Sequence, residues 1–115
     1  MATGMEISRR DVAPETVVIA LAGRVMMGPA SEAIVTQVED SLRQGKRIII
    51  FDLSAVTSID STGIGRFISG YNKIAAAGGE LRMAGATGHI FEAFHVSLLD
   101  TVFPFYESVE AAQAA

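Results

Sequence analysis

The chain has 115 residues, half of them hydrophobic, with a net charge of −4 and no cysteine. This length fits a single domain spanning residues 1–115, with a core that needs no disulfide to hold it. The composition excludes disulfides, zinc–thiolate sites and thiol catalysis, and it argues against general nucleic-acid binding, which needs a basic face.

The N-terminal part of the chain predicts two strands joined by a turn. Residues 5–10 alternate weakly between apolar and polar side chains, as an edge strand does. Residues 11–15, which include Pro14, predict the turn. Residues 17–22 are β-branched and apolar on both faces, which predicts a buried strand that ends at Gly23. Because the connection is short, these two strands can pair antiparallel.

A helix and a central strand follow. Pro29 is tolerated in the first turn of a helix that Gly45 ends. The apolar stripe of this helix consists of Ile34, Val38 and Leu42. Residues 47–53 are apolar on both faces and predict the central strand of a sheet. Residues 54–61 are polar and lack helical periodicity, so they predict a loop.

A second helix is predicted from Thr62 to the glycine pair at residues 78–79. Its apolar positions recur with helical spacing, and they are Ile64, Phe67, Ile68, Tyr71, Ile74 and Ala75. The remaining predicted elements are a strand at residues 80–84, a helix at 88–96, an edge strand at 102–106 and a short terminal helix at 107–114.

The alternation of helices and buried strands predicts the α/β class. Helices between consecutive buried strands imply right-handed crossovers and parallel pairing. We therefore predict a single domain with a mixed, largely parallel central sheet of four to five strands and about four helices.

The stretch Asp-Ser-Thr-Gly-Ile-Gly at residues 60–65 is the one motif with chemical content. It follows the central strand, at the end where open α/β sheets usually bind ligands and partners. Asp60 or Ser61 can cap the second helix, and Gly63 and Gly65 let another backbone approach. The free N–H groups and the helix dipole favour an anion, so a phosphate on Ser61 would add about −1.5 to −2 charges without unfolding the domain. Taken alone, the pattern is also typical of an ordinary helix cap.

This motif, placed between a buried strand and an amphipathic helix, resembles the signature of the STAS family of anti-sigma-factor antagonists. The resemblance extends over essentially the entire chain, and the Gly-Gly-Glu-Leu turn at residues 78–81 is similar as well. It implies a STAS-like fold and a protein that regulates transcription by binding an anti-sigma factor that is also a serine kinase with bound ATP.

The resemblance also implies a switch. The unphosphorylated form would capture the kinase and free the sigma factor, phosphorylation of Ser61 would release the kinase, and a phosphatase would reset the state. The partner contact is expected on the loop, the exposed helix face and the segment that follows the second strand, at Met26, Asp60, Thr62, Gly63, Ile64, Gly65, Arg66, Ser69 and Lys73.

One departure from the family pattern concerns the end of the second strand. Many members have Gly-Glu-Leu-Asp there, whereas this chain has Gly-Arg-Val-Met at residues 23–26. A base, Arg24, replaces an acid, and Met26 replaces an aspartate that contributes to kinase recognition. Met26 and Met27 are expected to pack on the core, and the alternative is a soft partner-binding patch. The departure also favours a second hypothesis, a non-phosphorylated adaptor subunit of a transporter complex or a stress-sensing assembly.

Other constellations lack a complete motif. His89 and His95 lie six residues apart, which does not align them on one helix face for a metal. Ser61, His89 and Asp52 supply the residue types of a hydrolase triad, but the Gly-x-Ser-x-Gly elbow is absent. No dinucleotide fingerprint or P-loop is present. We therefore expect no metal, no cofactor and no catalytic activity.

The apolar runs of the chain are short. The longest, residues 17–23 and 48–51, cannot span a bilayer, and the N-terminus lacks a basic start followed by a long apolar stretch. We therefore expect a cytoplasmic protein without direct membrane insertion.

Overall fold

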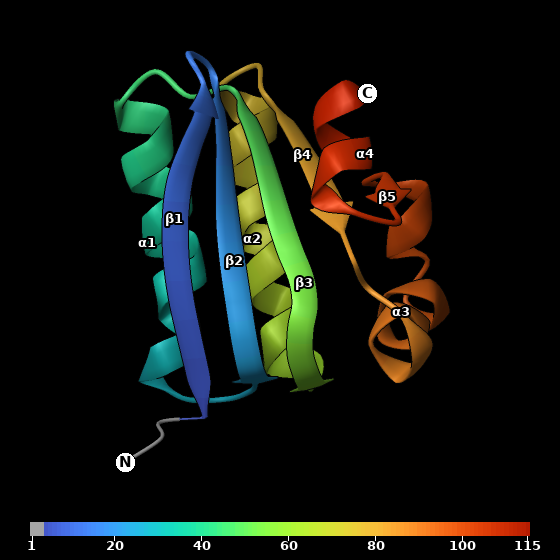
Figure 1. Ribbon diagram of the computed structural model, residues 1–115. Coiled ribbons are helices and arrows are strands. Elements are labelled where there is room, and N and C mark those ends of the chain that lie inside the picture. The colour runs from blue at the N-terminus through green and yellow to red at the C-terminus, as the bar shows by residue number, and fades with distance from the viewer. Residues whose placement is uncertain (1–3) are drawn as a thin grey trace.

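The computed structural model describes residues 4–115, which form a five-stranded sheet in the order β1-β2-β3-β4-β5 with four α-helices (Figure 1). The strands are β1 (Met5–Ala13), β2 (Thr16–Val25), β3 (Ile48–Ile59), β4 (Glu80–Ala84) and β5 (Phe105–Tyr106). The helices are α1 (Pro29–Arg43), α2 (Ser61–Ala76), α3 (Gly88–Val96) and α4 (Val109–Ala114), with a 3-10 turn, η1 (Leu99–Thr101), after α3.

The sheet is mixed in the way that the sequence predicts. β1 pairs antiparallel with β2, and the β2–β3, β3–β4 and β4–β5 pairs are all parallel. The central strand β3 begins with side chains that are buried on both faces, because helices cover both faces there. The predicted α/β class, strand number and helix number are confirmed.

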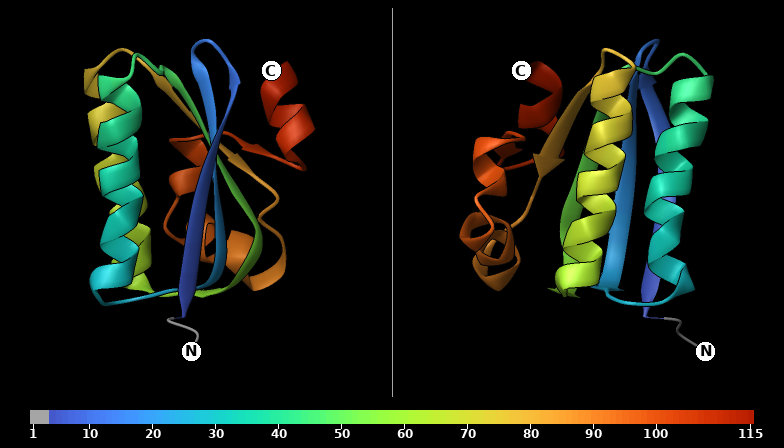
Figure 2. Two further views of the ribbon diagram at one scale, coloured as in Figure 1. Left: turned by 60° about the vertical axis from the view of Figure 1, so that its left-hand side comes forward. Right: turned by 180° about the vertical axis from the view of Figure 1, so that it is seen from behind.

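Helices α1 and α2 lie side by side on one face of the sheet (Figure 2). Phe67 of α2 is fully buried between Phe51 of β3 and Phe94 of α3, with ring centroids 5.1 Å and 5.4 Å apart in edge-on geometry. Large buried aromatic side chains dominate the energetics of a core. This contact therefore fixes the position of α2 and, with it, the first turn that carries the motif.

Helix α4 covers part of the opposite face of the sheet. Val109 and Ala112 of this helix pack on a second apolar cluster formed by Val18, Ile50 and Ala84. The buried guanidinium of Arg82 donates to the carbonyl oxygen of Ala112 at 2.9 Å and so ties α4 down. Beyond this contact at Val18, no helix among the described elements covers β1 and β2 on this face (Figure 1).

The predicted loop at residues 54–61 is wrong for most of its length. β3 continues through these residues to Ile59 because β2 continues past Gly23 to Val25, and the two extensions pair in parallel. Val56 is buried, whereas its neighbours Ala55 and Thr57 are exposed. Strand pairing and one buried side chain therefore hold residues 54–59 of β3 in place. One buried side chain gives the sequence little apolar periodicity, so the strand could not be recognised there.

The ends of the chain also differ in detail from the predictions. β1 runs to Ala13, so the predicted turn at residues 11–15 is shorter than expected. The predicted edge strand at 102–106 is reduced to the two residues of β5, because η1 and an exposed Val102 precede it. α4 begins at Val109, where the side chain of Ser108 accepts a hydrogen bond from the N–H of Ala111 and caps the helix.

Candidate functional site

The candidate site lies where the carboxyl ends of β2 and β3 meet the starts of α1 and α2. Val25 pairs with Ile59, the last residue of β3, and a short connection at residues 26–28 leads from β2 into α1. Asp60 then joins β3 to α2, and its N–H donates to the carbonyl oxygen of Val25 at 3.2 Å. The fold thus brings residues 25–28 and 60–63 together from two separate turns.

Asp60 fastens these two turns with its carboxylate. Its Oδ1 accepts from the N–H of Gly63 at 2.8 Å, which makes it the N-cap of α2, and its Oδ2 accepts from the N–H of Met27 at 3.0 Å. These backbone hydrogen bonds, first that of Gly63 and then that of Met27, hold the pKa of Asp60 below its ordinary value. The charged carboxylate of Asp60 therefore links the loop that follows β2 to the first turn of α2.

Ser61 is the first residue of α2, and its side chain is exposed. Because Asp60 supplies the cap, the hydroxyl of Ser61 is not needed for that task, and it has no side-chain hydrogen bond within residues 4–115. The helix from 61 to 76 presents its amino end at this point. The arrangement leaves a free hydroxyl at the positively polarised end of a helix.

The next three motif residues have different surroundings. A Cβ on Gly63 would collide with the carbonyl oxygen of Val25 and lie 2.9 Å from Cγ1 of Ile59, so this glycine permits the close approach of α2 to the ends of the strands. Ile64 is only 9% exposed and belongs to the core. Gly65 has open space where a Cβ would be. Of the two glycines, only Gly65 leaves room for another molecule.

The outward face of α2 is linked to α1 by charged pairs. Nε of Arg66 donates to the hydroxyl of the buried Ser31 at 3.1 Å, and its guanidinium lies 3.7 Å from the carboxylate of Glu32. Lys73 pairs with Glu39 at 3.1 Å. Ser69 lies between these pairs, in a shallow depression of 340 Å³ between the two helices. Exposed ion pairs of this kind add little stability, so this face is a solvated surface whose cations are already paired.

The expected packing of Met26 and Met27 on the core is wrong. Met26 is 37% exposed and Met27 is 78% exposed, and the loop that carries them lies beside the amino end of α2. Val25, the last residue of β2, is the fully buried residue at this point, and the sulfur of Met26 accepts from the hydroxyl of Ser58 at 3.9 Å. The alternative, a soft apolar patch next to Ser61, fits this placement. The predicted site residues include Met26 but not Met27, although two consecutive methionines after a strand are a visible signal.

A comparison of the sequence with protein-family models identifies the family that has this motif and fold. A model described as the STAS domain matches residues 9–112. The chain belongs to the STAS domain family. A comparison with curated proteins finds no match.

Among solved structures, this STAS domain is similar to an anti-sigma factor antagonist from Mycobacterium paratuberculosis, with 27% identity, a TM-score of 0.80, and 96% of this chain and 92% of that chain covered. It is also similar to the Bacillus cell fate determinant SpoIIAA in its phosphorylated form, with 24% identity, a TM-score of 0.75, and coverage of 95% and 98%. A sulfate transporter family protein from Wolinella succinogenes gives 15% identity, a TM-score of 0.78, and coverage of 91% and 87%. The last two similarities concern the fold. Antagonists of this kind are binding modules rather than enzymes.

His89 and Asp52, which with Ser61 supply the residue types of a hydrolase triad, each bind other groups in this chain. His89 Nε2 lies 2.7 Å from the carbonyl oxygen of Thr57, and Asp52 accepts from the hydroxyl of Ser54 at 2.7 Å. His95 lies 2.8 Å from Asp100, whose carboxylate raises the pKa of that imidazole by hydrogen bonding and by charge. None of these contacts activates Ser61 as a nucleophile. Within residues 4–115, no three His, Asp or Glu side chains gather as a metal site.

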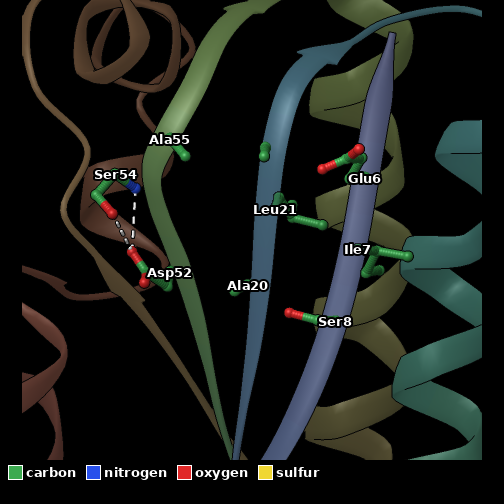
Figure 3. Close-up of a pocket in the computed structure, with 9 residues that line it drawn as sticks. Glu6, Ile7, Ser8, Ala20, Leu21, Asp52, Ser54 and Ala55 are labelled. Atoms are coloured by element: carbon green, nitrogen blue, oxygen red, sulfur yellow. Dashed lines mark hydrogen bonds between the residues drawn. The ribbon is translucent and has the colours of Figure 1, made fainter. Parts of the chain in front are cut away.

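A separate hollow of 360 Å³ lies on the uncovered face of the sheet, between β1, β2 and β3 (Figure 3). Its lining includes the carboxylates of Glu6 and Asp52, small side chains such as Ser8 and Ala20, and no lysine or arginine. A lining with this charge does not suit an anionic cofactor such as a nucleotide.

None of the helices within residues 4–115 has the length and apolar character that a bilayer span requires.

Proposed function

We propose that this STAS domain is an anti-sigma-factor antagonist whose binding to an anti-sigma factor is switched by phosphorylation of Ser61. The role as an anti-sigma-factor antagonist is supported by the family and by the similarity to the mycobacterial antagonist. The observation that carries the switch is the exposed hydroxyl of Ser61, which needs no partner because Asp60 already caps the helix. The similar protein SpoIIAA, which has solved structures in an unphosphorylated and a phosphorylated form, supports the choice of this chemistry.

The amino end of α2 accounts for a switch without unfolding. A phosphate there is favoured by the helix dipole and would add about −1.5 to −2 charges beside the carboxylate of Asp60. Weakening a contact a hundredfold takes about 2.7 kcal/mol, which the repulsion or desolvation of one such charge in an interface can supply. The partner would be an anti-sigma factor that is also a serine kinase, and a phosphatase would reset the switch.

The test uses candidate anti-sigma factor kinases from the same genome as this chain. The protein is incubated with each kinase and ATP, and its intact mass is measured. We expect one added phosphate on the wild type and on Ser69→Ala, and none on Ser61→Ala. Ser69 is the matched control because it is an exposed serine on the same helix. Modification of Ser61→Ala would contradict the assignment of the site.

Binding measurements complete the test. By calorimetry, Ser61→Asp is expected to fold like the wild type and to bind the anti-sigma factor more weakly, because it carries part of the charge of the phosphate. Equal affinities for Ser61→Asp and the wild type would contradict the switch.

A second candidate is the non-phosphorylated adaptor subunit. Two observations favour it: Arg24 and Met26 replace the acids of the family pattern, and a transporter family protein has a similar fold. An unchanged mass with every kinase that binds the chain would support the adaptor over the switch.

A further inference from the structure

Arg24 is a cation without a counter-ion beside the candidate site. It lies near the carboxyl end of β2, opposite Ser58 of β3, and its side chain is exposed. The cations on α2, Arg66 and Lys73, are paired with Glu32 and Glu39 of α1. No carboxylate within residues 4–115 forms an ion pair with Arg24.

The carboxylate that lies in this region is already engaged. Asp60 accepts hydrogen bonds from the N–H groups of Gly63 and Met27 with its two oxygens. Arg24 therefore presents an uncompensated positive charge to whatever enters the hollow that it lines with Met26 and Met27. Unpaired charges next to a binding surface steer association and select partners of opposite sign.

Apolar side chains lie next to this cation. Met27 is 78% exposed, Met26 is 37% exposed, and Arg24 and both methionines line one hollow of 180 Å³. Ile68, one of the exposed large apolar side chains, lies two turns along α2 from the amino end that carries Ser61. Methionine and arginine are enriched in the buried cores of protein interfaces, and methionine adapts its shape to its partner.

The hydrogen bonds of Asp60 preorganise the surface that contains Ser61, Met26 and Met27. Because the backbone of Met27 is bonded to the residue that precedes Ser61, the methionines and the serine are held in one arrangement. A surface that is already ordered loses less conformational entropy when it binds.

We propose that the partner that docks at Ser61 presents a carboxylate to Arg24 and an apolar recess to Met27. This inference rests on the proposed function and defines the chemistry of the partner. The acid lies on the partner and the base on this chain, so an anti-sigma factor that offers a cation at this point is repelled. Phosphorylation of Ser61 places negative charge in the same interface, where it opposes the carboxylate of the partner.

The test compares charge reversals at Arg24 and Arg10, the two exposed arginines that form no ion pair within residues 4–115. Arg24→Glu and Arg10→Glu change the net charge equally, but Arg10 lies opposite Val18, toward the other end of β2. The affinity for the anti-sigma factor that binds the wild type is measured by calorimetry at low and at physiological salt. We expect Arg24→Glu to bind at least tenfold more weakly, about 1.4 kcal/mol, and Arg10→Glu to stay within twofold of the wild type.

Two further variants isolate the parts of the proposal. Met27→Ala keeps the N–H that Asp60 accepts, and it is expected to lose at least tenfold in affinity with an unchanged unfolding midpoint. A carboxylate-to-lysine change on the partner is expected to restore binding of Arg24→Glu. If Arg24→Glu binds like Arg10→Glu, or if Met27→Ala binds like the wild type, the inference is overturned while the proposed function stands. If the wild type binds no anti-sigma factor, the proposed function fails, and this inference fails with it.

Discussion

At the scale of single residues, Asp60 and Ser61 have different roles in the site. Asp60 takes the structural task, since both of its oxygens accept backbone hydrogen bonds. Ser61 is thereby left exposed, without a structural role for its hydroxyl. The sequence predicted that one of the two would cap the helix but could not say which. The bond to Met27 was beyond prediction because it joins residues 33 positions apart in the chain.

The charge of Asp60 has a pH signature. Since its pKa is lowered in the folded state, its contribution to stability is complete above the ordinary pKa of about 3.9 and is lost as the pH falls through the folded value. The substitution Asp60→Asn keeps a neutral cap without the charge. We expect this variant to be less stable than the wild type at pH 7, and the difference to shrink below about pH 4. Urea unfolding of both proteins across this range measures it, and a constant difference would show that the charge contributes nothing.

The exposed methionine makes a prediction that needs no partner. Met27 is 78% exposed, Met83 is fully buried, and the chain has no cysteine to consume an oxidant. Among Met26, Met27 and Met83, dilute hydrogen peroxide is expected to convert Met27 to its sulfoxide first, Met26 later and Met83 last, because access to the sulfur controls the rate. Peptide mass mapping over time gives the order. Oxidation of Met83 before Met27 would contradict the exposure of this loop.

At the scale of elements, the predictions succeeded where burial imposes a period and failed where strand pairing alone orders the backbone. Of the predicted stripe of α2, Ile64, Phe67 and Ile74 are buried in the core. Ile68 and Ala75, which were predicted on the same stripe, are exposed. The outer part of β3 was missed because Val56 is its one buried residue. Ala55 and Thr57 are exposed, and Ile59 is only partly buried against the core. Its order comes from the matching extension of β2, which is a non-local contact.

The contact between α2 and the strand ends can be tested with two glycines of one helix. Gly63→Ala is expected to destabilise the domain by about 1–3 kcal/mol, because the new methyl meets the backbone of Val25, which cannot move aside easily. Gly65→Ala adds the same group where nothing lies within 4 Å, and it is expected to be neutral or stabilising by up to about 1 kcal/mol. Urea unfolding at one pH compares them. Equal effects of the two changes would contradict this packing.

At the scale of the whole molecule, one core unites the sheet with three helices. Side chains from the four strands β1 to β4 and from α1, α2 and α3 join one buried cluster, while α4 closes a smaller one on the opposite face. A domain of this size unfolds cooperatively with a net stability of about 5–15 kcal/mol. The class and helix number were predictable because they follow from the alternation of elements, whereas the meeting of two turns at Asp60 required the completed fold.

The aromatic centre of that core sets its overall stability. Phe67→Ala is expected to cost about 3–5 kcal/mol, because the side chain is fully buried between two rings. Ile68→Ala, a truncation one position along on the exposed side of α2, is expected to change stability by less than about 1 kcal/mol. Denaturant unfolding followed by circular dichroism compares the two variants. A Phe67→Ala protein as stable as Ile68→Ala would contradict the central place of this ring.

The uncovered face of β1 and β2 has a consequence for how this domain is assembled with others. A helix or a neighbouring chain laid across it would rest on short side chains and meet the carboxylates of Glu6 and Asp52. Helix α2, which begins at Ser61, lies on the other side of the sheet (Figure 2). We therefore expect a molecule that rests on the hollow of the uncovered face to leave the hydroxyl of Ser61 open to a second one.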